Sequence, residues 1–512
     1  MKNTEPTTNL VSYTQSRTRP VTEFMDEIGA PYIEWSGNLS KYESLWSHYT
    51  GESLEVTSKK DKRVMLFPLR DNLFAKFVDL HSALLWGAET EGALVAFYTD
   101  SILSDSEGVD QTPSDVISAV LIESGGYEKL REAARMFNTF GSVLIGITPN
   151  DYNVSKGEIT VVSPQSAIPV FGPDGELDEL WIVMWIAGST ARRMGWTGKN
   201  DDQVIYAEHW TKDSWEIVLG VGGRKITAVD GDGEELAGPN VYKSKNGRKM
   251  IPYKFVKRLP IGNDGQSLIT SIVGLVEELN ARSSDMGLAI MESSHQKTWV
   301  RNYDGKKNLN LNDYTDGRVI PLGNAVGDMS QPEMGVIQPA PQPESHMKFI
   351  EWLEDQVRQN THTAAVILGL DEGSQRSGET MTARALPTIA IINDYRDSWA
   401  NAFLYLAKVA IIIYNLRAGK EVDDNAIVRT NYNPILSRDR EVIANIEAVL
   451  KGAGLRSTKT SVQKLGDVRD VDTEVKEIEK ERKESAEFGA TTNTLATGNS
   501  GPKAELPVRD KG

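Results

Sequence analysis

The sequence of 512 residues contains no cysteine. This absence excludes disulfide bonds, thiolate zinc sites and cysteine nucleophiles, and it suits a protein assembled in a reducing cytoplasm. A GxxxxGK[ST] phosphate loop is also missing, which excludes a P-loop ATPase. The six histidines never stand four residues apart, the spacing of a metal-binding helix face. We therefore expect no enzyme, with no catalytic residue, no cofactor and no metal ion.

Three glycine-containing stretches come near functional motifs without matching them. "GVGGRK" (220–225) lacks the GxGxxG spacing, and "DGDGEE" (230–235) lacks the ligand pattern of a calcium loop. "EGSQRSG" (372–378) does not match GxSxG. The first two are expected to be hairpin turns.

Long apolar runs are scarce. The most apolar one, "FLYLAKVAIIIYNL" (403–416), is shorter than a bilayer requires and contains Lys408. It predicts a buried helix. The polar start of the chain shows no secretory signal. We expect no membrane partner.

The charge balance is acidic. With 56 Lys and Arg against 72 Asp and Glu, the formal net charge is −16. Such a surface repels nucleic acid, so any contact with DNA is expected to be local, transient or non-adhesive. The length predicts two or more domains.

Apolar periodicity divides the chain into segments. Residues 24–140 are mainly helical, and Trp35, Trp46 and Trp86 are expected in the core. From about 142 to 260 short strands predominate. The predicted strands are "SVLIGIT", "EITVVS", "LDELWIVMWIA", "RRMGWTG", "QVIYAEHWT", "SWEIVLGV" and "RKITAVDGDGEEL".

The second half of the chain predicts long helices. One runs from about Ile269 to Gln296, and a glycine- and proline-rich module follows to about 341. Helices are then expected over 342–362 and 378–417, with a kink at Pro387. The polar stretch "LGLDEGSQRSGETMTARA" (368–385) contains the connection between them. After 435 come a helix, a glycine turn, a second helix and, from about 486, a low-complexity tail that we expect to be disordered.

The order of these parts resembles the portal proteins of tailed bacteriophages, in the branch that includes the portal of the Bacillus phage SPP1. The resemblance covers about 24 to 485. It is carried by "IPYKFVKR…GNDGQSLI…LVEELNARSSD", by the loop ending in "SGETMTARA", and by "GAGLRSTKTSVQKLGDV" followed by D-x-E-x-x-x-I-x-x-E.

The resemblance implies an α+β portal fold with an α/β wing, a helical stem, a small α/β clip and a helical crown. It also implies assembly as a ring, usually a dodecamer, around a central channel at one capsid vertex. The implied parts are a flexible arm (1–23), wing (24–264 and 379–434), stem helices (265–296 and 342–363), clip (297–341), tunnel loop (364–378), crown (435–485) and disordered tail (486–512).

In such a ring the polar loop would face double-stranded DNA, which passes without sequence-specific contact. Flexible polar groups suit this position, because many lysines would grip the phosphates and act as a salt-dependent brake. The loop residues assigned to it are Asp371, Glu372, Ser374, Gln375, Arg376 and Ser377.

The resemblance also implies partners and a location. The clip would meet the terminase large subunit and later a head-completion or adaptor protein, and the ring would contact major capsid and scaffolding proteins. The protein would be assembled in the host bacterial cytoplasm and reside in the virion. A basic cluster near the clip could contact DNA or an acidic partner, or be ordinary solvated surface; it comprises Lys297, Arg301, Lys306 and Lys307.

Two other functions are alternatives to a portal protein. A minor capsid component would lack the helix–small module–helix excursion over 265–363. A terminase would need a phosphate loop and acidic metal-binding clusters, and the missing loop argues against it.

Overall fold

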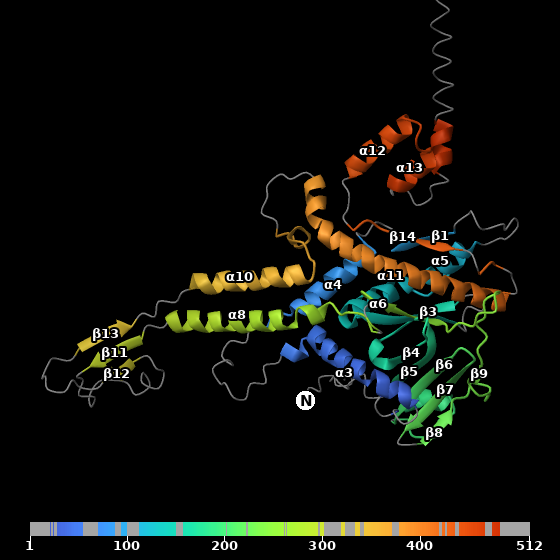
Figure 1. Ribbon diagram of the computed structural model, residues 1–512, viewed down its shortest axis with the longest axis horizontal. Helices are drawn as coiled ribbons and strands as arrows, with labels where there is room; N and C mark the ends of the chain where they lie inside the picture. The colour runs from blue at the N-terminus through green and yellow to red at the C-terminus, as the bar shows by residue number, and fades with distance from the viewer. Residues whose placement is uncertain are drawn as a thin grey trace, which may run out of the picture. The chain divides into compact units, whose positions relative to one another are not determined.

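The computed structural model describes residues 21, 24, 28–54, 70–87, 94–99, 112–149, 157–200, 202–221, 224–260, 262, 264–294, 297–301, 319–322, 333–337, 343–370, 378–418, 422–424, 427–435, 440–465 and 474–481. The chain forms two compact units, 1–435 and 436–512. Figure 1 shows the elements of both units, coloured from blue at the N-terminus to red at the C-terminus.

The first unit begins with helices whose apolar faces build the core. In α4 (Leu73–Trp86), residues at helical spacing such as Phe74, Phe77 and Val78 are buried, as the sequence predicts. The Asn72 side chain accepts a hydrogen bond from Ala75 N and caps the start of α4. The neighbouring helices are α3 (Ala30–Thr50), α5 (Pro113–Glu123) and α6 (Gly126–Phe140).

Gly141 ends α6 in the left-handed conformation, with φ of 86°. The chain then enters β2 (Ser142–Pro149), the middle strand of an antiparallel sheet with β10 (Tyr253–Lys257) and β3 (Gly157–Val162). A separate pair joins β1 (Val95–Thr99) to β14 (Val428–Tyr432), which is far along the chain.

A larger antiparallel sheet has the strand order β4-β5-β6-β7-β8, and β9 also pairs with β7. Its hairpins agree with the predicted turns: β7 and β8 pair on either side of 222–223, and Asp230 Oδ1 accepts hydrogen bonds from Asp232 N and Glu234 N. The strands are β4 (Ala167–Phe171), β5 (Leu177–Ala187), β6 (Gln203–Thr211), β7 (Ser214–Val221), β8 (Arg224–Thr227) and β9 (Ala237–Pro239).

The predicted strand "RRMGWTG" is wrong. Gly188–Arg193 form the short helix α7, and the chain then turns through Gly195, where φ is 89°. Ala191 and Trp196 are buried together in a small satellite core with Val204 and Leu219. Packing of these side chains requires a reversal of the chain here, which local propensity does not reveal.

Two helices and a small sheet form an excursion from the core. The helix α8 (Val273–Ser294) follows a short 3₁₀ turn at Ile269–Ser271, and it packs alongside α10 (Pro343–Asn360), as Figure 1 shows. Between them in the chain come β11 (Lys297–Arg301), β12 (Val319–Leu322) and β13 (Glu333–Ile337). Their order is β12-β11-β13, with β12 parallel and β13 antiparallel to β11.

The helix α11 (Gly378–Ala418) runs through the core. Tyr395, Trp399 and Phe403 on it are fully or almost fully buried. By length and composition α11 could cross a membrane, but 61% of its most apolar window is buried inside the protein. The helix contains Pro387, and Figure 1 shows a bend near its beginning, as a proline predicts.

The second unit contains α12 (Arg440–Gly452) and α13 (Thr458–Leu465), separated by a turn through Gly454 with φ of 68°. An ion pair joins Arg456 in this turn to the nearly buried Glu447 on α12. Residues 474–481 are helical. The predicted order of helix, glycine turn and helix is confirmed.

Candidate functional site

The candidate site is the joint between α10 and α11, from which the polar loop emerges. The six loop residues Asp371, Glu372, Ser374, Gln375, Arg376 and Ser377 lie outside the described residues. The structure does describe both roots of the loop. On one side, the 3₁₀ turn η6 (Ala365–Leu368) ends at Gly369, with φ of 70°. On the other, α11 begins at Gly378.

A chain of hydrogen bonds ties the end of α10 to α4. Thr361 Oγ1 donates to Val357 O at 2.9 Å, and it also lies 2.9 Å from Thr363 Oγ1. Thr363 Oγ1 in turn lies 2.9 Å from His81 Nε2. Since each hydroxyl carries one proton, Thr363 donates to Thr361 and accepts from the Nε2–H of His81. All three side chains are almost completely buried, so these hydrogen bonds fix the joint to the core.

His81 is neutral in this setting. Burial, with a smaller contribution from the nearby Arg258 and His362, lowers the pKa of His81 to about 3. Its Nδ1 is buried and has no hydrogen-bond partner in the described part of the chain. A neutral ring that donates from Nε2 is therefore the form that supports the joint.

A second set of hydrogen bonds joins the joint to α11. Thr388 Oγ1 donates to His362 O at 2.7 Å and accepts from Ala364 N at 2.9 Å. His362 has φ of 55°, a left-handed conformation that costs a non-glycine residue about 1–2 kcal/mol. Thr388 directly follows Pro387, so the bent part of α11 places the hydroxyl where it holds the strained turn.

An open cavity of about 500 Å³ lies beside the joint. Its lining includes Asp355, Arg358, His362 and Arg384, and Asp355 pairs with Arg358. The described residues contain no group of three or more histidine and acidic side chains that could hold a metal ion. The arrangement can position the two roots of a loop.

The basic cluster expected near the small sheet is described only in part. Lys297 begins β11 and Arg301, which is exposed, ends it. Arg301 lies opposite Glu333 of β13 in the strand register, so an acidic residue is its cross-strand neighbour. Lys306 and Lys307 lie outside the described residues.

The helix α10 presents apolar side chains on both sides. Leu353 and Val357, four residues apart on the helix, are buried, whereas Met347 is 47% exposed. Phe349 and Trp352 are 40% and 50% exposed, and their rings stack at 5.7 Å. The two stacked rings form an exposed apolar surface that a partner could cover.

The comparison with known families decides the identity. The family described as "Phage portal protein, SPP1 Gp6-like" matches residues 96–487, more than three quarters of the chain. The chain belongs to this phage portal protein family. The resemblance inferred from the sequence and the α+β portal fold are thereby confirmed.

Other comparisons add little to the family assignment. No curated protein matches the sequence of this portal protein. Among solved structures, a chain from the "Virion of native gene transfer agent (GTA) particle" is similar with 12% identity and a TM-score of 0.39, over 81% of this chain and 92% of that one. As a family member, the protein is a structural component of the phage head.

Sequence reasoning missed the residues that hold the joint of this portal protein. The local signal was the polar "THT" (361–363) between two apolar helical patterns. Its partners His81 and Thr388 lie far away in the sequence, so the pattern alone gave no means to pair them.

Proposed function

We propose that this portal protein assembles into a ring, usually a dodecamer, whose channel passes double-stranded DNA during packaging and ejection. The observation that carries the proposal is the excursion of α8 and α10, which pack side by side and enclose the small sheet β11–β13 in the chain. The exposed Phe349 and Trp352 on α10 support it, because a neighbouring copy would cover them.

Within this proposal the parts carry the roles expected from the family. The helices α8 and α10 lie within the two proposed stem segments, and β11–β13 lie within the proposed clip. The proposed boundaries are 24–264 and 379–434 for the wing, 265–296 and 342–363 for the stem, 297–341 for the clip, 364–378 for the tunnel loop and 435–485 for the crown.

The tunnel loop would face the DNA. Its two acidic residues, Asp371 and Glu372, outnumber its one basic residue, Arg376. Acidic and neutral polar groups form few ion pairs with phosphates, and this favours sliding over adhesion. The hydrogen bonds of Thr363 and Thr388 support the role, because they hold one root of the loop against the core.

The proposed partners follow from the same assignment. The clip would bind the terminase large subunit and later an adaptor protein, while the rest of the ring would contact capsid and scaffolding proteins. The exposed Arg301 at the end of β11 is suited to an acidic partner. ATP hydrolysis would belong to the terminase.

The first test is the mass of the purified protein by native mass spectrometry, with electron micrographs of the same sample. We expect about twelve times 56.6 kDa and rings with a central hole wide enough for a DNA duplex. If the free protein is a monomer, the measurement is repeated on particles assembled with scaffolding protein. A stable dimer, or particles without a hole, would contradict the proposal.

The loop assignment has a separate test in a DNA-packaging reaction with purified heads. Replacing Asp371 and Glu372 together by lysine is expected to slow DNA movement, most strongly at low salt, because added cations pair with phosphates. Replacement by asparagine and glutamine is the matched control and should leave the salt dependence nearly unchanged. Equal salt dependence in both variants would place the loop away from DNA.

The alternative is a structural head component without a channel. The exposed aromatic rings would also suit such a protein, because they indicate a partner of any kind. The electron micrographs distinguish the two, since only the portal assignment predicts a central hole.

A further inference from the structure

A row of side chains crosses the large sheet on one face, in a region separate from the joint. Trp181 on β5 lies opposite His209 on β6, and His209 lies opposite Glu216 on β7. Residues in cross-strand register share a face of the sheet, so these three side chains are neighbours. Glu179, two residues before Trp181, is on the same face.

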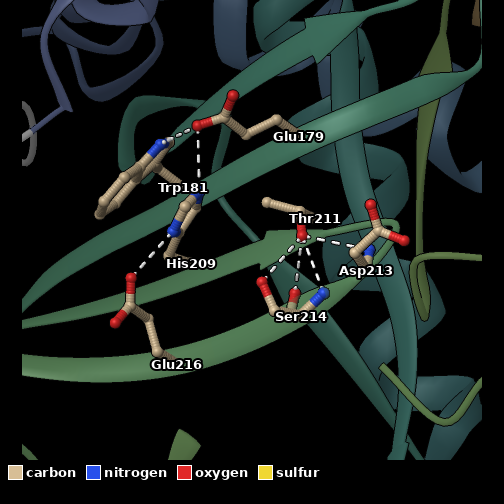
Figure 2. Close-up of polar contacts among 7 residues, drawn as sticks. All are labelled: Glu179, Trp181, His209, Thr211, Asp213, Ser214 and Glu216. Carbon is tan, nitrogen blue, oxygen red and sulfur yellow. Dashed lines mark hydrogen bonds and ion pairs between the residues drawn. The ribbon is translucent and has the colours of Figure 1, made fainter. Parts of the chain in front are cut away.

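His209 has a carboxylate at each ring nitrogen. Nε2 lies 3.0 Å from Glu179 Oε1, and Nδ1 lies 3.1 Å from Glu216 Oε1 (Figure 2). The indole N–H of Trp181 donates to the same Glu179 oxygen at 2.7 Å. The rings of Trp181 and His209 stack at 3.8 Å with an interplanar angle of 10°.

If the ring is neutral and both carboxylates are ionised, only one of the two contacts can be a hydrogen bond. This geometry therefore requires one more bound proton. A neutral imidazole has a single N–H, and an ionised carboxylate only accepts hydrogen bonds. Both contacts of His209 are hydrogen bonds when the ring is doubly protonated, so that it donates to β5 and β7 at once. When the proton leaves to water, one nitrogen lone pair faces a carboxylate oxygen.

We propose that His209 is a proton-operated brace across β5, β6 and β7: its protonated ring joins Glu179 to Glu216, and loss of the proton releases one of the two contacts. The brace needs no partner molecule. It is independent of the proposed channel function, because it rests only on contacts within one chain.

In the described part of the chain, the charged groups that face the His209 ring are the carboxylates of Glu179 and Glu216. On β4, Ile168 and Val170 lie opposite Trp181 and Glu179, and on β9 Ala237 lies opposite Glu216. The ring of Phe24 packs on Trp181.

The other charged groups nearby point to the opposite face of the sheet. Glu208 on β6 accepts hydrogen bonds there from Trp210, Tyr206 and Tyr253. Asp178, which forms an ion pair with Lys212, directly precedes Glu179 on β5. Its side chain therefore points to the opposite face of the sheet. The His209 side chain is 18% exposed, so water can reach it to deliver or accept the proton.

The sign of the pH effect follows from the bound proton. The brace stabilises the sheet while the ring is protonated, and it weakens as rising pH removes that proton. The Thr211 hydroxyl at the end of β6 closes the β6–β7 hairpin independently, by accepting from Asp213 N and Ser214 N (Figure 2). Loss of the brace therefore loosens the ends of β6 and β7 beside the turn without opening the turn itself.

The test compares the full-length protein with two variants by thermal unfolding at about pH 5.5 and pH 8.5. His209→Gln removes the titrating ring, so the stabilisation of the wild type over this variant should shrink by about 1–2 °C at the higher pH. Glu216→Gln supplies an amide N–H that can donate to a neutral Nδ1. This variant should keep both contacts at high pH and show a flatter pH dependence than the wild type.

The emission of Trp181 provides a second, local readout. It is isolated as the difference between each protein and the same protein carrying Trp181→Phe. Because a protonated imidazole stacked on an indole quenches its emission, Trp181 should brighten from pH 5.5 to pH 8.5 in the wild type and stay constant in His209→Gln. Parallel unfolding curves for wild type, His209→Gln and Glu216→Gln, or a constant Trp181 emission in the wild type, would each overturn the proposal.

Discussion

At the scale of single residues, a few buried hydroxyls and one imidazole decide how the joint is built. Thr388 serves two backbone groups with one hydroxyl, and His81 reaches Thr363 from another helix. Buried polar groups cost most when one partner is removed and the other stays behind. The joint should therefore respond strongly to small changes of side chain.

Thr388→Val tests this directly. The change preserves shape but leaves His362 O and Ala364 N without their partner, which should cost about 1–3 kcal/mol in local stability. Hydrogen exchange followed by mass spectrometry should show faster exchange in residues 361–366. Thr388→Ser, which keeps the hydroxyl, should exchange nearly as the wild type does. Equal protection in Thr388→Val would show that the hydroxyl does not hold the joint.

The lowered pKa of His81 predicts that the folded protein loses stability in acid. Its folded pKa of about 3 lies below the ordinary value of 6.5, so the unfolded chain binds a proton that the folded chain excludes. Stability from this group is present above pH 6.5 and falls as the pH drops toward 3, by about 1 kcal/mol per pH unit. His81→Gln can still donate to Thr363 and should flatten this part of the acid unfolding profile. An unchanged profile would contradict the assignment.

At the scale of elements, the end of α6 shows why one glycine is required and another is less critical. A Cβ at Gly141 would lie 2.6 Å from backbone atoms of Gln266 and Ser267, which lead into α8. Gly125, before α6, also has a positive φ, but a Cβ there meets nothing within 4 Å. A side chain at Gly125 would add backbone strain alone, whereas a side chain at Gly141 would add both backbone strain and a steric conflict.

Alanine at these two glycines should therefore have unequal effects. Gly125→Ala is expected to cost about 1–2 kcal/mol, the strain of a left-handed non-glycine residue. Gly141→Ala adds displacement of the segment before α8 and should lower the midpoint of thermal unfolding at least twice as far. Similar midpoints for both variants would mean that the segment at Gln266 yields without cost.

At the scale of the whole molecule, the exposed aromatic pair on α10 links one chain to the assembly. Burying rings such as Phe349 and Trp352 against a second copy removes apolar surface from water. A charge in the same place must be desolvated on assembly, which costs several kcal/mol without a partner.

Trp352→Glu should therefore reduce or abolish the ring seen by native mass spectrometry. Trp352→Phe retains the apolar ring and should still assemble. Circular dichroism should be the same for both variants, because the side chain is half exposed in the single chain. Rings of unchanged mass in Trp352→Glu would place the contact between copies elsewhere.

The sequence by itself determined the order of elements and the family. The periods of 3.6 and 2 residues located α4, α6, α8, α10, α11 and most strands, because those patterns depend on burial of one face of each element. They also located the polar loop between α10 and α11. The bend at Pro387 follows from the chemistry of proline, which lacks the N–H of a helical hydrogen bond.

Only the tertiary structure decided which residues meet. "RRMGWTG" became a short helix and a turn because Ala191 and Trp196 pack in a satellite core. The outward position of Met347 depends on which face of α10 meets its neighbours. His81 meets Thr363 although 282 residues separate them, and His209 meets Glu179 and Glu216 across the register of three neighbouring strands. Such pairings arise from strand register and helix packing, and a single sequence does not encode them in any local pattern.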